Sequence, residues 1–498
     1  MAFSISNDSI DQLESQTWDY ARLGTFHEFC HELRTDDNPE SQMPLGMFSA
    51  WAWSRAFGSH EAAMRSVNLL WAAIALAAFA RIGKRVSIPW LPLLFAIQPF
   101  VWYYMNRART PMMEMTGGAL LLMGTIACLQ KKPVDSLSSI SLCVGAILLS
   151  GASMLGLIPL AAVAAGLTAH GLWSRLHWPR PGKIFLSVTC GLIVVLACYY
   201  LATVLHEGRG SQLWRVSPAN LCFVGYEFLG LQGLDPGRQE LRSIMKGFVP
   251  FRELLPFLPG LLVFLCAYLA LFAAGLKSWL TRDPAPGGTS APKEESIDQE
   301  ASGRAGLRLF QVWLLGVGVA GLSAILLFAL AMFTGVPFWG RSLAGAFPFW
   351  VVALAITIQW ARQGLWRKTG RAAASVVVIL LLLSSLFIRL LPQHKHDDYR
   401  GAAAEAMRLG AAGQSVWWVA DYSGGVYYGL PLGTAPAPGV VEFAMNKCPS
   451  ADSLPDAVVI SRPDNFDSTG EITKLLSSGK YSRKLSLQAF EVWEKSPL

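Results

Sequence analysis

The sequence contains few charged residues for its length. Asp, Glu, Lys and Arg make up 15% of its 498 residues, whereas soluble domains carry roughly 25%. Hydrophobic residues make up 53%, and long stretches carry no charge. A soluble protein of this size would need more polar surface to cover itself. The composition therefore excludes soluble, fibrous and disordered classes and predicts a polytopic α-helical membrane protein.

Other common signals are missing as well. The eight cysteines form no C-x-x-C pair, and five of them lie inside apolar runs, so a disulfide framework is excluded. One pair among Cys30, Cys222 and Cys448 stays open. The first residues, MAFSISNDSIDQLES, lack the basic and apolar regions of a signal peptide. No Walker loop, dinucleotide fingerprint after a strand or G-x-S-x-G elbow occurs, which argues against the use of ATP or a nucleotide sugar through a cytoplasmic α/β domain.

Apolar runs of membrane-spanning length are present instead. A span needs about 17–25 apolar residues. Ten segments meet this criterion: 62–82, 86–105, 112–130, 136–153, 156–174, 184–205, 255–276, 308–333, 342–361 and 372–391. Only a short turn separates the fourth from the fifth, which predicts a tight hairpin.

The basic residues behind the net charge of +7 are distributed according to these spans. Lysines and arginines gather in every second loop, for example after the first span (Arg81, Lys84 and Arg85) and after the ninth (Arg362, Arg367, Lys368 and Arg371). Such loops belong on the cytoplasmic side, so the charge indicates orientation rather than a nucleic-acid partner. We therefore predict a multi-pass plasma (inner) membrane protein whose C-terminal domain lies on the outer, periplasmic side.

The pattern predicts three regions. Residues 1–60 form an outer-face loop with juxtamembrane helices, and residues 61–391 form the transmembrane domain. That domain includes an outer loop at 206–254 and a cytoplasmic linker at 277–307, disordered over 283–303 because DPAPGGTSAPKEESIDQEASG has no apolar period. In residues 392–498, helical stretches alternate with short strands such as SVWWVA and DAVVIS, which predicts a small α/β domain. An outer N-terminus with no span before it means either that the charged tail crosses the membrane by itself or that an eleventh helix lies upstream of Met1, and we favour the second.

Acidic residues recur near the start of the chain. Asp8, Asp11 and Glu14 follow one another every three residues. On a helix, Asp8 and Asp11 would share a face, and the apolar residues Ile10, Leu13 and Ala21 would be available to lie on the bilayer. Paired carboxylates beside an apolar surface suit a general base, because burial and like charge raise one pKa toward neutrality. The alternative interpretation is an acidic, solvated helix face.

Several cations depart from the positive-inside pattern. Arg107 and Arg109 lie in QPFVWYYMNRARTPMMEM between the second and third spans, and Glu114 begins the third. Arg341, in VPFWGRSLAGAFPFW, lies where the ninth span begins on the outer side. Guanidinium groups at a helix end can reach the bilayer surface without any function. The functional alternative is that they bind a phosphate.

Two competing interpretations concern other classes of protein. His27-Glu28-Phe29-Cys30-His31 matches the H-E-x-x-H motif of zinc proteases, and LDPG at 234–237 is similar to the third-ligand motif of intramembrane site-2 proteases. However, the polar sequence ELRTDDNPE follows the histidine pair, and LDPG lies in a polar loop. A lipid-sugar flippase or transporter is the second alternative, although the spans show no internal two-fold repeat.

In their order along the chain, these features resemble the GT-C glycosyltransferases, in particular the branch of protein O-mannosyltransferases and lipid A aminoarabinose transferases. The early acids come first, followed by the interfacial helix MPLGMFSAWAWSRAFGS and the aromatic stretch WYYMNRARTP. GRSLAGAFPFW and then DDYRGAAAEAM follow late in the chain. The resemblance covers most of the sequence. The family usually has an adjacent Asp-Glu pair where this chain has Asp8-Ser9.

This resemblance implies a specific chemistry. The enzyme would move a sugar from a polyprenyl-phosphate donor to a hydroxyl of a lipid, glycan or protein acceptor at the outer face, with inversion at the anomeric carbon. Asp8 would be the general base, with Asp11 as the second candidate for this role. Arg107, Arg109, Arg341 and Glu114 would form the phosphate-binding site. Some relatives use a divalent metal and others do not, and these residues leave both possibilities open.

Overall fold

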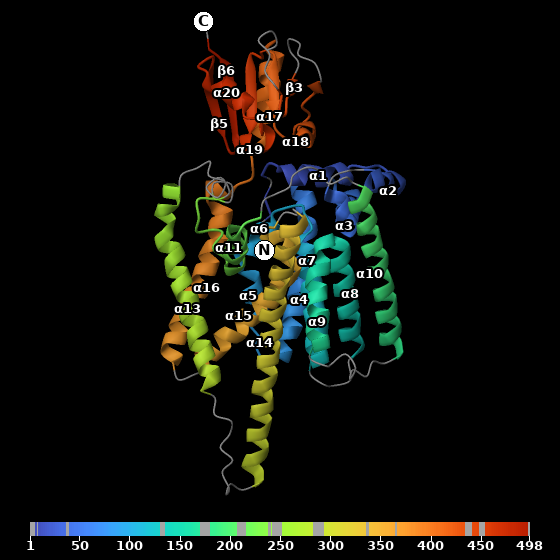
Figure 1. Cartoon of the computed structure of the whole chain (residues 1–498), viewed down its shortest axis with the longest axis vertical. Helices are drawn as coiled ribbons and strands as arrows, with labels where there is room; N and C mark the ends of the chain where they lie inside the picture. Colours follow the sequence, from blue (N-terminus) through green and yellow to red (C-terminus); the bar gives the residue numbers. More distant parts are fainter. Residues whose placement is uncertain are drawn as a thin grey trace.

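The computed structural model describes residues 5–6, 8–35, 39–129, 135–169, 180–206, 216–237, 241, 251–281, 293–334, 338–363, 366–433, 441–447 and 454–496. An upright bundle of helices carries a layer of short helices across one end, and a sheet domain stands on that layer (Figure 1). We call this end of the bundle the upper end. The candidate site lies where the three layers meet.

Long apolar helices form the bundle. By length and composition, seven segments of the described chain are able to cross a membrane. They correspond to α4 (Glu61–Arg85), α7 (Pro111–Leu129), α10 (Arg180–His206), α13 with the preceding turn η5 (Leu258–Leu280 and Phe251–Phe257), α14 (Lys293–Thr334), α15 with the preceding turn η6 (Phe347–Gln363 and Gly340–Ala346) and α16 (Arg367–Leu390). Two shorter apolar helices, α8 (Ser136–Ala152) and α9 (Leu157–Ala169), are joined by the turn η3 (Met154–Gly156) and form the expected hairpin.

Helix α7 lies at the centre of the bundle, where it packs on α4, α8 and α15. Nearly all its residues are buried. Glycines allow the close approach to α8: a side chain at Gly145 would lie 2.5 Å from the backbone nitrogen of Leu121, and one at Gly124 would lie 2.9 Å from the carbonyl of Ser138. Small residues at such contacts are how membrane helices pack without a hydrophobic driving force.

The segment 86–105, which we expected to form one span, forms two short helices instead. These are α5 (Leu91–Ala96) and α6 (Pro99–Met105). Pro92 and Pro99 each lie in the first turn of one of these helices. Proline is accepted there but cannot continue a preceding helix, because it lacks the N–H and its ring clashes with the turn before it. The apolar run therefore breaks at each proline, and α6 leads directly into the arginine-bearing loop.

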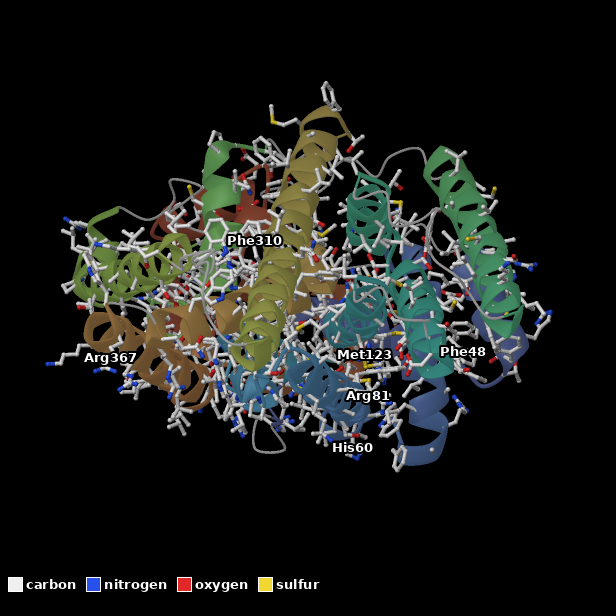
Figure 2. The ribbon with its side chains drawn as sticks, turned by 90° about the horizontal axis from the view of Figure 1, so that it is seen from below. Phe48, His60, Arg81, Met123, Phe310 and Arg367 are labelled. Carbon is white, nitrogen blue, oxygen red and sulfur yellow. The ribbon has the colours of Figure 1, made fainter. Side chains whose placement is uncertain are left out.

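The lower end of the bundle carries the basic loops. Figure 2 views the molecule from this end, with Arg81 of α4 and Arg367 of α16 on different helices. Our expectation of disorder over 283–303 is wrong in its second half, because α14 already begins at Lys293. The sequence KEESIDQEASGRA is rich in good helix formers, which explains the extension. The rest of that linker lies outside the described residues.

Short helices form the layer across the upper end (Figure 1). They are α1 (Gln12–Ala21), α2 (Phe26–Thr35), the turn η2 (Pro39–Gln42) and the Trp-rich α3 (Pro44–Phe57). Two expectations are wrong here. Asp8 precedes α1 and shares no helical face with Asp11, which is the N-cap of the helix. Ile10 and Ala21 are not on a bilayer surface but are buried against Met64 and the tyrosines at 427–428.

The C-terminal region forms an α/β domain around a six-stranded sheet of order β2-β3-β1-β4-β6-β5. Strands β1 to β4 are parallel to one another. Strand β6 pairs antiparallel with β4, and β5 pairs antiparallel with β6, so only β6 runs against the others. Strand bounds are β1 Val416–Val419, β2 Leu432–Gly433, β3 Val441–Phe443, β4 Ala457–Ser461, β5 Tyr481–Leu487 and β6 Phe490–Lys495. The helices are α17 (Tyr399–Ala411), α18 (Tyr422–Tyr427), α19 (Pro463–Phe466) and α20 (Glu471–Ser477), and the turn η7 (Pro392–His394) leads into the domain.

Candidate active site

A buried ion pair lies at the centre of the upper end. Arg65, near the start of α4, donates from Nε and Nη2 to the two carboxylate oxygens of Glu14, at 2.8 and 2.7 Å. Neither side chain is exposed. Two parallel charge-assisted bonds of this kind fix the geometry of both groups. The pair therefore locks α1 onto the first turns of the α4 membrane helix.

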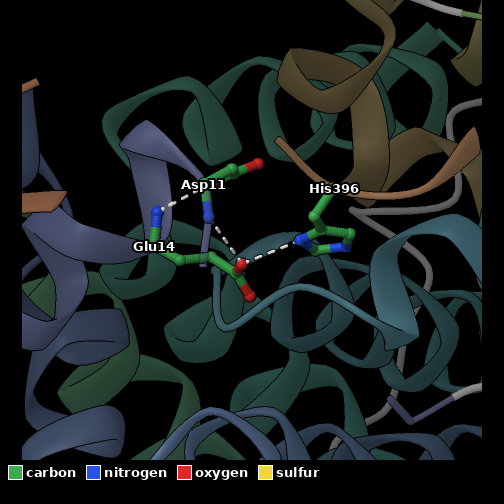
Figure 3. Close-up of side chains that lie close together, drawn as sticks. All are labelled: Asp11, Glu14 and His396. Atoms are coloured by element: carbon green, nitrogen blue, oxygen red, sulfur yellow. Dashed lines mark hydrogen bonds and ion pairs between the residues drawn. The ribbon is translucent and has the colours of Figure 1, made fainter. Parts of the chain in front are cut away.

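The same two residues also form hydrogen bonds with other segments of the chain. The second guanidinium nitrogen of Arg65, Nη1, donates to the carbonyls of Ser6 and Asp8 at 3.0 and 2.8 Å. Glu14 accepts the backbone N–H of Ala108 at 2.8 Å and lies 3.1 Å from Nδ1 of His396 (Figure 3). We call Glu14, Arg65 and His396 the buried triad. It joins the N-terminal segment, α4, the loop after α6 and the linker to the C-terminal domain.

The protonation states of the triad follow from its burial and charges. Burial raises the pKa of Glu14, but the charge of Arg65 and then that of His396 outweigh it and hold this pKa well below its usual range. Burial, with a contribution from Arg65, lowers the pKa of His396 to about 4. At neutral pH Glu14 is thus an ionised and fully bonded carboxylate. Such a group is a poor proton acceptor and serves as a structural anchor.

Asp11 is also occupied. Its Oδ1 accepts the backbone N–H of Leu13 and of Glu14, at 3.0 and 2.9 Å, and so caps α1. Its other oxygen forms an ion pair with Arg107. The Arg107 guanidinium also lies over the ring of Tyr103, 4.5 Å from its centroid. Only 3% of the Asp11 side chain is exposed, so this carboxylate holds Arg107 in place.

Asp8 differs from both of these acids. Its side chain is 31% exposed, and its carboxylate lies 3.8 Å from the guanidinium of Arg389, which is itself 33% exposed. Arg389 lies in the last turn of α16. Since Arg65 donates to the carbonyl of Asp8, the backbone is fixed while the carboxylate stays partly exposed. The most accessible of the three predicted acids thus lies against a cation from a distant helix.

Arg109 pairs with a buried acid, and Arg341 lies within electrostatic range of another. Arg109 pairs with Glu40 of η2 at 2.5 Å and donates to the carbonyl of Leu13 at 3.0 Å. Glu114 is buried, accepts the hydroxyl of Thr110 at 3.1 Å and experiences the charge of Arg341. The predicted cations from distant parts of the chain therefore converge, but beside carboxylates.

A cavity of about 20 Å³ lies between α1, α3 and α4. Thr17, Gly46, Asn68, Arg109 and Thr110 are among its lining residues. This volume holds roughly one water molecule. The Trp-rich helix α3 thus covers a small cavity, and a sugar would fit there only after the lining moves.

The acids do not suit a divalent cation. Asp11, Glu14 and His396 present ligand atoms within 4.8 Å of one another, which is the kind of cluster that binds a metal (Figure 3). However, Arg65 already occupies both oxygens of Glu14, and Arg107 pairs with Asp11. A metal would have to displace two guanidinium groups from acids that are already neutralised. We therefore derive no step that depends on a metal.

The C-terminal domain rests directly on this site. Arg400 pairs with Glu61 at 2.7 Å, and the hydroxyl of Tyr428 accepts the backbone N–H of Ile10 at 2.9 Å. At the same interface Ser15 donates to Asp421 at 2.7 Å. The domain is thus hydrogen-bonded both to α1 and to the start of α4.

Asp421 makes this interface sensitive to pH. Burial, with Asp19 and Glu40 nearby, raises the pKa of Asp421 to about 6 although Ser15 and Gly424 donate to it. A group whose pKa is raised on folding stabilises the fold fully below its unfolded pKa and loses that contribution as the pH rises through the folded value. The contribution of Asp421 to the free energy of unfolding should therefore fall by roughly 2–3 kcal/mol between pH 4 and pH 6, since one pKa unit corresponds to about 1.4 kcal/mol. It is measured as the difference between wild type and Asp421→Asn, because the lowered pKa values of His394 and His396 raise the total stability over the same range.

The measurement is the midpoint temperature of thermal unfolding, determined at several pH values from pH 4 to pH 7. Asp421→Asn should remove this pH-dependent loss and raise the midpoint at pH 7, because asparagine caps α18 as well as aspartate does. Asp456→Asn is the matched control: Ser415 holds the pKa of that carboxyl below its usual range, so the variant should keep the loss. A difference in midpoint between wild type and Asp421→Asn that stays the same from pH 4 to pH 6 would contradict the prediction.

The H-E-x-x-H motif does not form a metal site in the part of the chain described. Both histidines lie on α2 and are exposed or half-exposed. The carboxylate of Glu28 accepts the backbone N–H groups of Gly24 and Thr25 instead, at 2.7 and 3.0 Å. Asp235 of LDPG lies near His394, at 3.9 Å. The zinc protease alternative therefore lacks an assembled site.

Sequence reasoning missed Arg65, Arg389, Glu40 and His396. Two of them carried a usable signal, because a charge within an apolar span is rare and usually faces protein. Arg65 interrupts the first span, and Arg389 lies at the upper end of the last one. Glu40 and His396 lie in polar segments, where nothing in the sequence sets them apart.

Two solved structures are similar to this chain, both of ArnT from Cupriavidus metallidurans. The apo crystal structure has 12% identity and a TM-score of 0.47, and the one bound to undecaprenyl phosphate has 13% identity and a TM-score of 0.40. Each comparison covers 99% of this chain and 96% of that one. ArnT is a lipid A aminoarabinose transferase of the GT-C glycosyltransferases. No protein-family model matches the chain, and no curated protein matches it.

Proposed function

We propose that this protein transfers a sugar from a polyprenyl-phosphate donor to an acceptor hydroxyl, with inversion at the anomeric carbon. The observation that carries the proposal is the accessible carboxylate of Asp8, which faces Arg389 above a rigid network of buried ion pairs. An anchored backbone with a solvent-accessible carboxylate is what a general base requires.

The guanidinium groups supply the second requirement. A phosphate is a good leaving group, so the enzyme needs positive charge to hold it rather than a strong acid. Arg389 lies beside Asp8, and Arg107 is fixed by Asp11 and Tyr103. Both arginines keep part of their surface exposed, and we assign them to the donor phosphate. Arg109 and Arg341 would contribute charge from behind, each held beside an acid.

In this scheme Asp8 removes the proton of the acceptor hydroxyl. The oxygen attacks the anomeric carbon in line with the carbon–oxygen bond to the phosphate, and that bond breaks. The phosphate leaves with both electrons of the bond, and the arginines stabilise the negative charge that it gains. Attack from the opposite face inverts the anomeric centre. Asp11 supports the reaction by positioning Arg107, and its carboxylate, already paired, is not the base.

The orientation in the membrane also belongs to the proposal. Basic residues gather at the lower end of the bundle, and the candidate site and the C-terminal domain lie at the other (Figure 1). By the positive-inside rule the lower end is cytoplasmic. The site would thus meet its donor in the outer leaflet of the plasma membrane.

The proposal is tested with purified full-length protein in nanodiscs and tritiated undecaprenyl phosphate. Wild type should bind this lipid, and Arg107→Gln should weaken binding about 10-fold or more, since a charge-assisted contact to phosphate is lost. Arg55→Gln is the control, because its side chain is exposed and lies over Trp51, away from the site. Binding that is absent in wild type or unchanged in Arg107→Gln would refute the proposal.

A further inference from the structure

A second buried polar cluster lies beside Arg107, outside the site described so far. It surrounds a cavity of about 10 Å³ lined by Tyr103, Phe223, Tyr226, Glu227, Gln232, Asp235 and His394. These residues come from α6, from α11 (Pro218–Leu229) with the loop that follows it, and from η7. The cavity borders the candidate phosphate site because the ring of Tyr103 lies under the Arg107 guanidinium.

Three polar atoms of this cluster have no hydrogen-bond partner among the described residues. They are the hydroxyl of Tyr226, Oε1 of Gln232 and Nε2 of His394, all without solvent exposure. Only 5% of the His394 side chain is exposed. An unpaired buried polar atom costs about 1–3 kcal/mol, and such atoms are usually bonded. Three around one cavity indicate a surface prepared for a polar ligand.

The chemistry of the lining identifies the kind of ligand. Glu227 and Asp235 are almost fully buried, and Gln232 donates to Glu227 at 3.2 Å. Burial lowers the pKa of His394 to about 4, so at neutral pH its ring is uncharged. The cluster thus offers carboxylate, amide, imidazole and phenol groups beside aromatic rings. Such groups bind the hydroxyls and the apolar face of a sugar ring.

We propose that this cavity, between α6, α11 and η7, is the sugar-binding subsite of the donor lipid. The inference rests on the proposed function and assigns the two parts of the donor to different residues: the phosphate lies at Arg107, and the ring enters on the other side of Tyr103. The cavity is smaller than a sugar ring, so α11 must move away from α6 when the donor binds. Sugar hydroxyls then bond the Tyr226 hydroxyl, Gln232 Oε1 and His394 Nε2.

Tyr226→Phe tests this assignment, because the lost hydroxyl has no partner among the described residues. A structural hydroxyl stabilises the protein, whereas an unpaired one does not. The variant should therefore unfold at the wild-type temperature or slightly above. Tyr199→Phe is the matched control, since the Tyr199 hydroxyl donates to the carbonyl of Ser41 at 2.8 Å; it should lower the unfolding temperature and leave lipid binding unchanged.

Binding is measured on full-length protein in nanodiscs. The probes are undecaprenyl phosphate and the same lipid carrying glucose, mannose, galactose or N-acetylglucosamine. Wild type should bind at least one of the sugar lipids about 10-fold more tightly than undecaprenyl phosphate. Tyr226→Phe should lose roughly 5- to 10-fold for that sugar lipid, the equivalent of one hydrogen bond, and nothing for undecaprenyl phosphate.

The outcomes separate this inference from the proposed function. If wild type binds all five lipids equally, or if Tyr226→Phe binds the preferred lipid as wild type does, the subsite is wrong and the phosphate site stands. If wild type binds none of the five, the proposed function fails and the subsite fails with it.

Discussion

Asp8→Asn is expected to lose sugar transfer by roughly 10²- to 10⁴-fold, the range in which a general base contributes. The amide occupies the same volume but accepts no proton from the acceptor. Because the backbone of residue 8 is held by Arg65 and its side chain is partly exposed, the unfolding temperature and the affinity for undecaprenyl phosphate should stay at the wild-type value. The measurement is transfer of radiolabelled sugar from a polyprenyl-phosphate donor in single-turnover conditions.

Two further variants make this result specific. Glu28→Gln changes an acid on exposed α2 and should transfer sugar as wild type does. Asp11→Asn should lower both donor affinity and stability, because Asp11 holds Arg107 and caps α1. An Asp8→Asn protein with wild-type transfer, beside an Asp11→Asn protein that binds the donor yet transfers nothing, would move the base to Asp11.

Arg65→Met is expected to destabilise the protein by about 3–5 kcal/mol, since it leaves the fully buried Glu14 charge without its partner. Neither side chain is exposed. The Ser6 and Asp8 carbonyls would lose their donor as well. The measurement is the free energy of unfolding in detergent, together with proteolysis of the segment before α1.

A double variant identifies the cause of this loss. Arg65→Met with Glu14→Leu removes both charges, and replacing a buried pair by apolar groups is often neutral or stabilising. The double variant should therefore recover at least half of the loss in Arg65→Met. A double variant that is less stable than Arg65→Met would show that the bonds to Ser6 and Asp8, not the ion pair, determine the stability.

The transmembrane layout could be predicted because long apolar runs allow few alternatives in a bilayer. Nine of the ten expected segments each contain one apolar helix in the described residues. The exception is 86–105, where Pro92 and Pro99 mark the starts of two separate helices. Our prediction of one span relied on the apolar composition of the whole segment and gave these prolines too little weight. The same emphasis led us to treat KEESIDQEASG as linker, although its residues favour a helix.

The roles of the three early acids could not be separated by spacing. Asp8, Asp11 and Glu14 look alike as a run with a period of three. What distinguishes them is a helix that begins at Gln12, so that one acid precedes it, one caps it and one points inward. The spacing of Asp11 and Glu14 is that of a capping box, a local signal of this start. The burial of Glu14, however, depends on contacts with Ala108 and Arg65, which are far away in the sequence.

The buried triad has a consequence for biosynthesis. His396 contacts Arg65 across 331 residues and Glu14 across 382. During translation, the first helix at the membrane surface must therefore wait until the last span has been made before its full set of partners exists. Contacts between such distant positions are slow to form. Chains that stop before residue 396 would leave the ribosome with an amino-terminal segment that lacks part of its native contacts. Quality-control proteases would be expected to cleave such chains first in this segment.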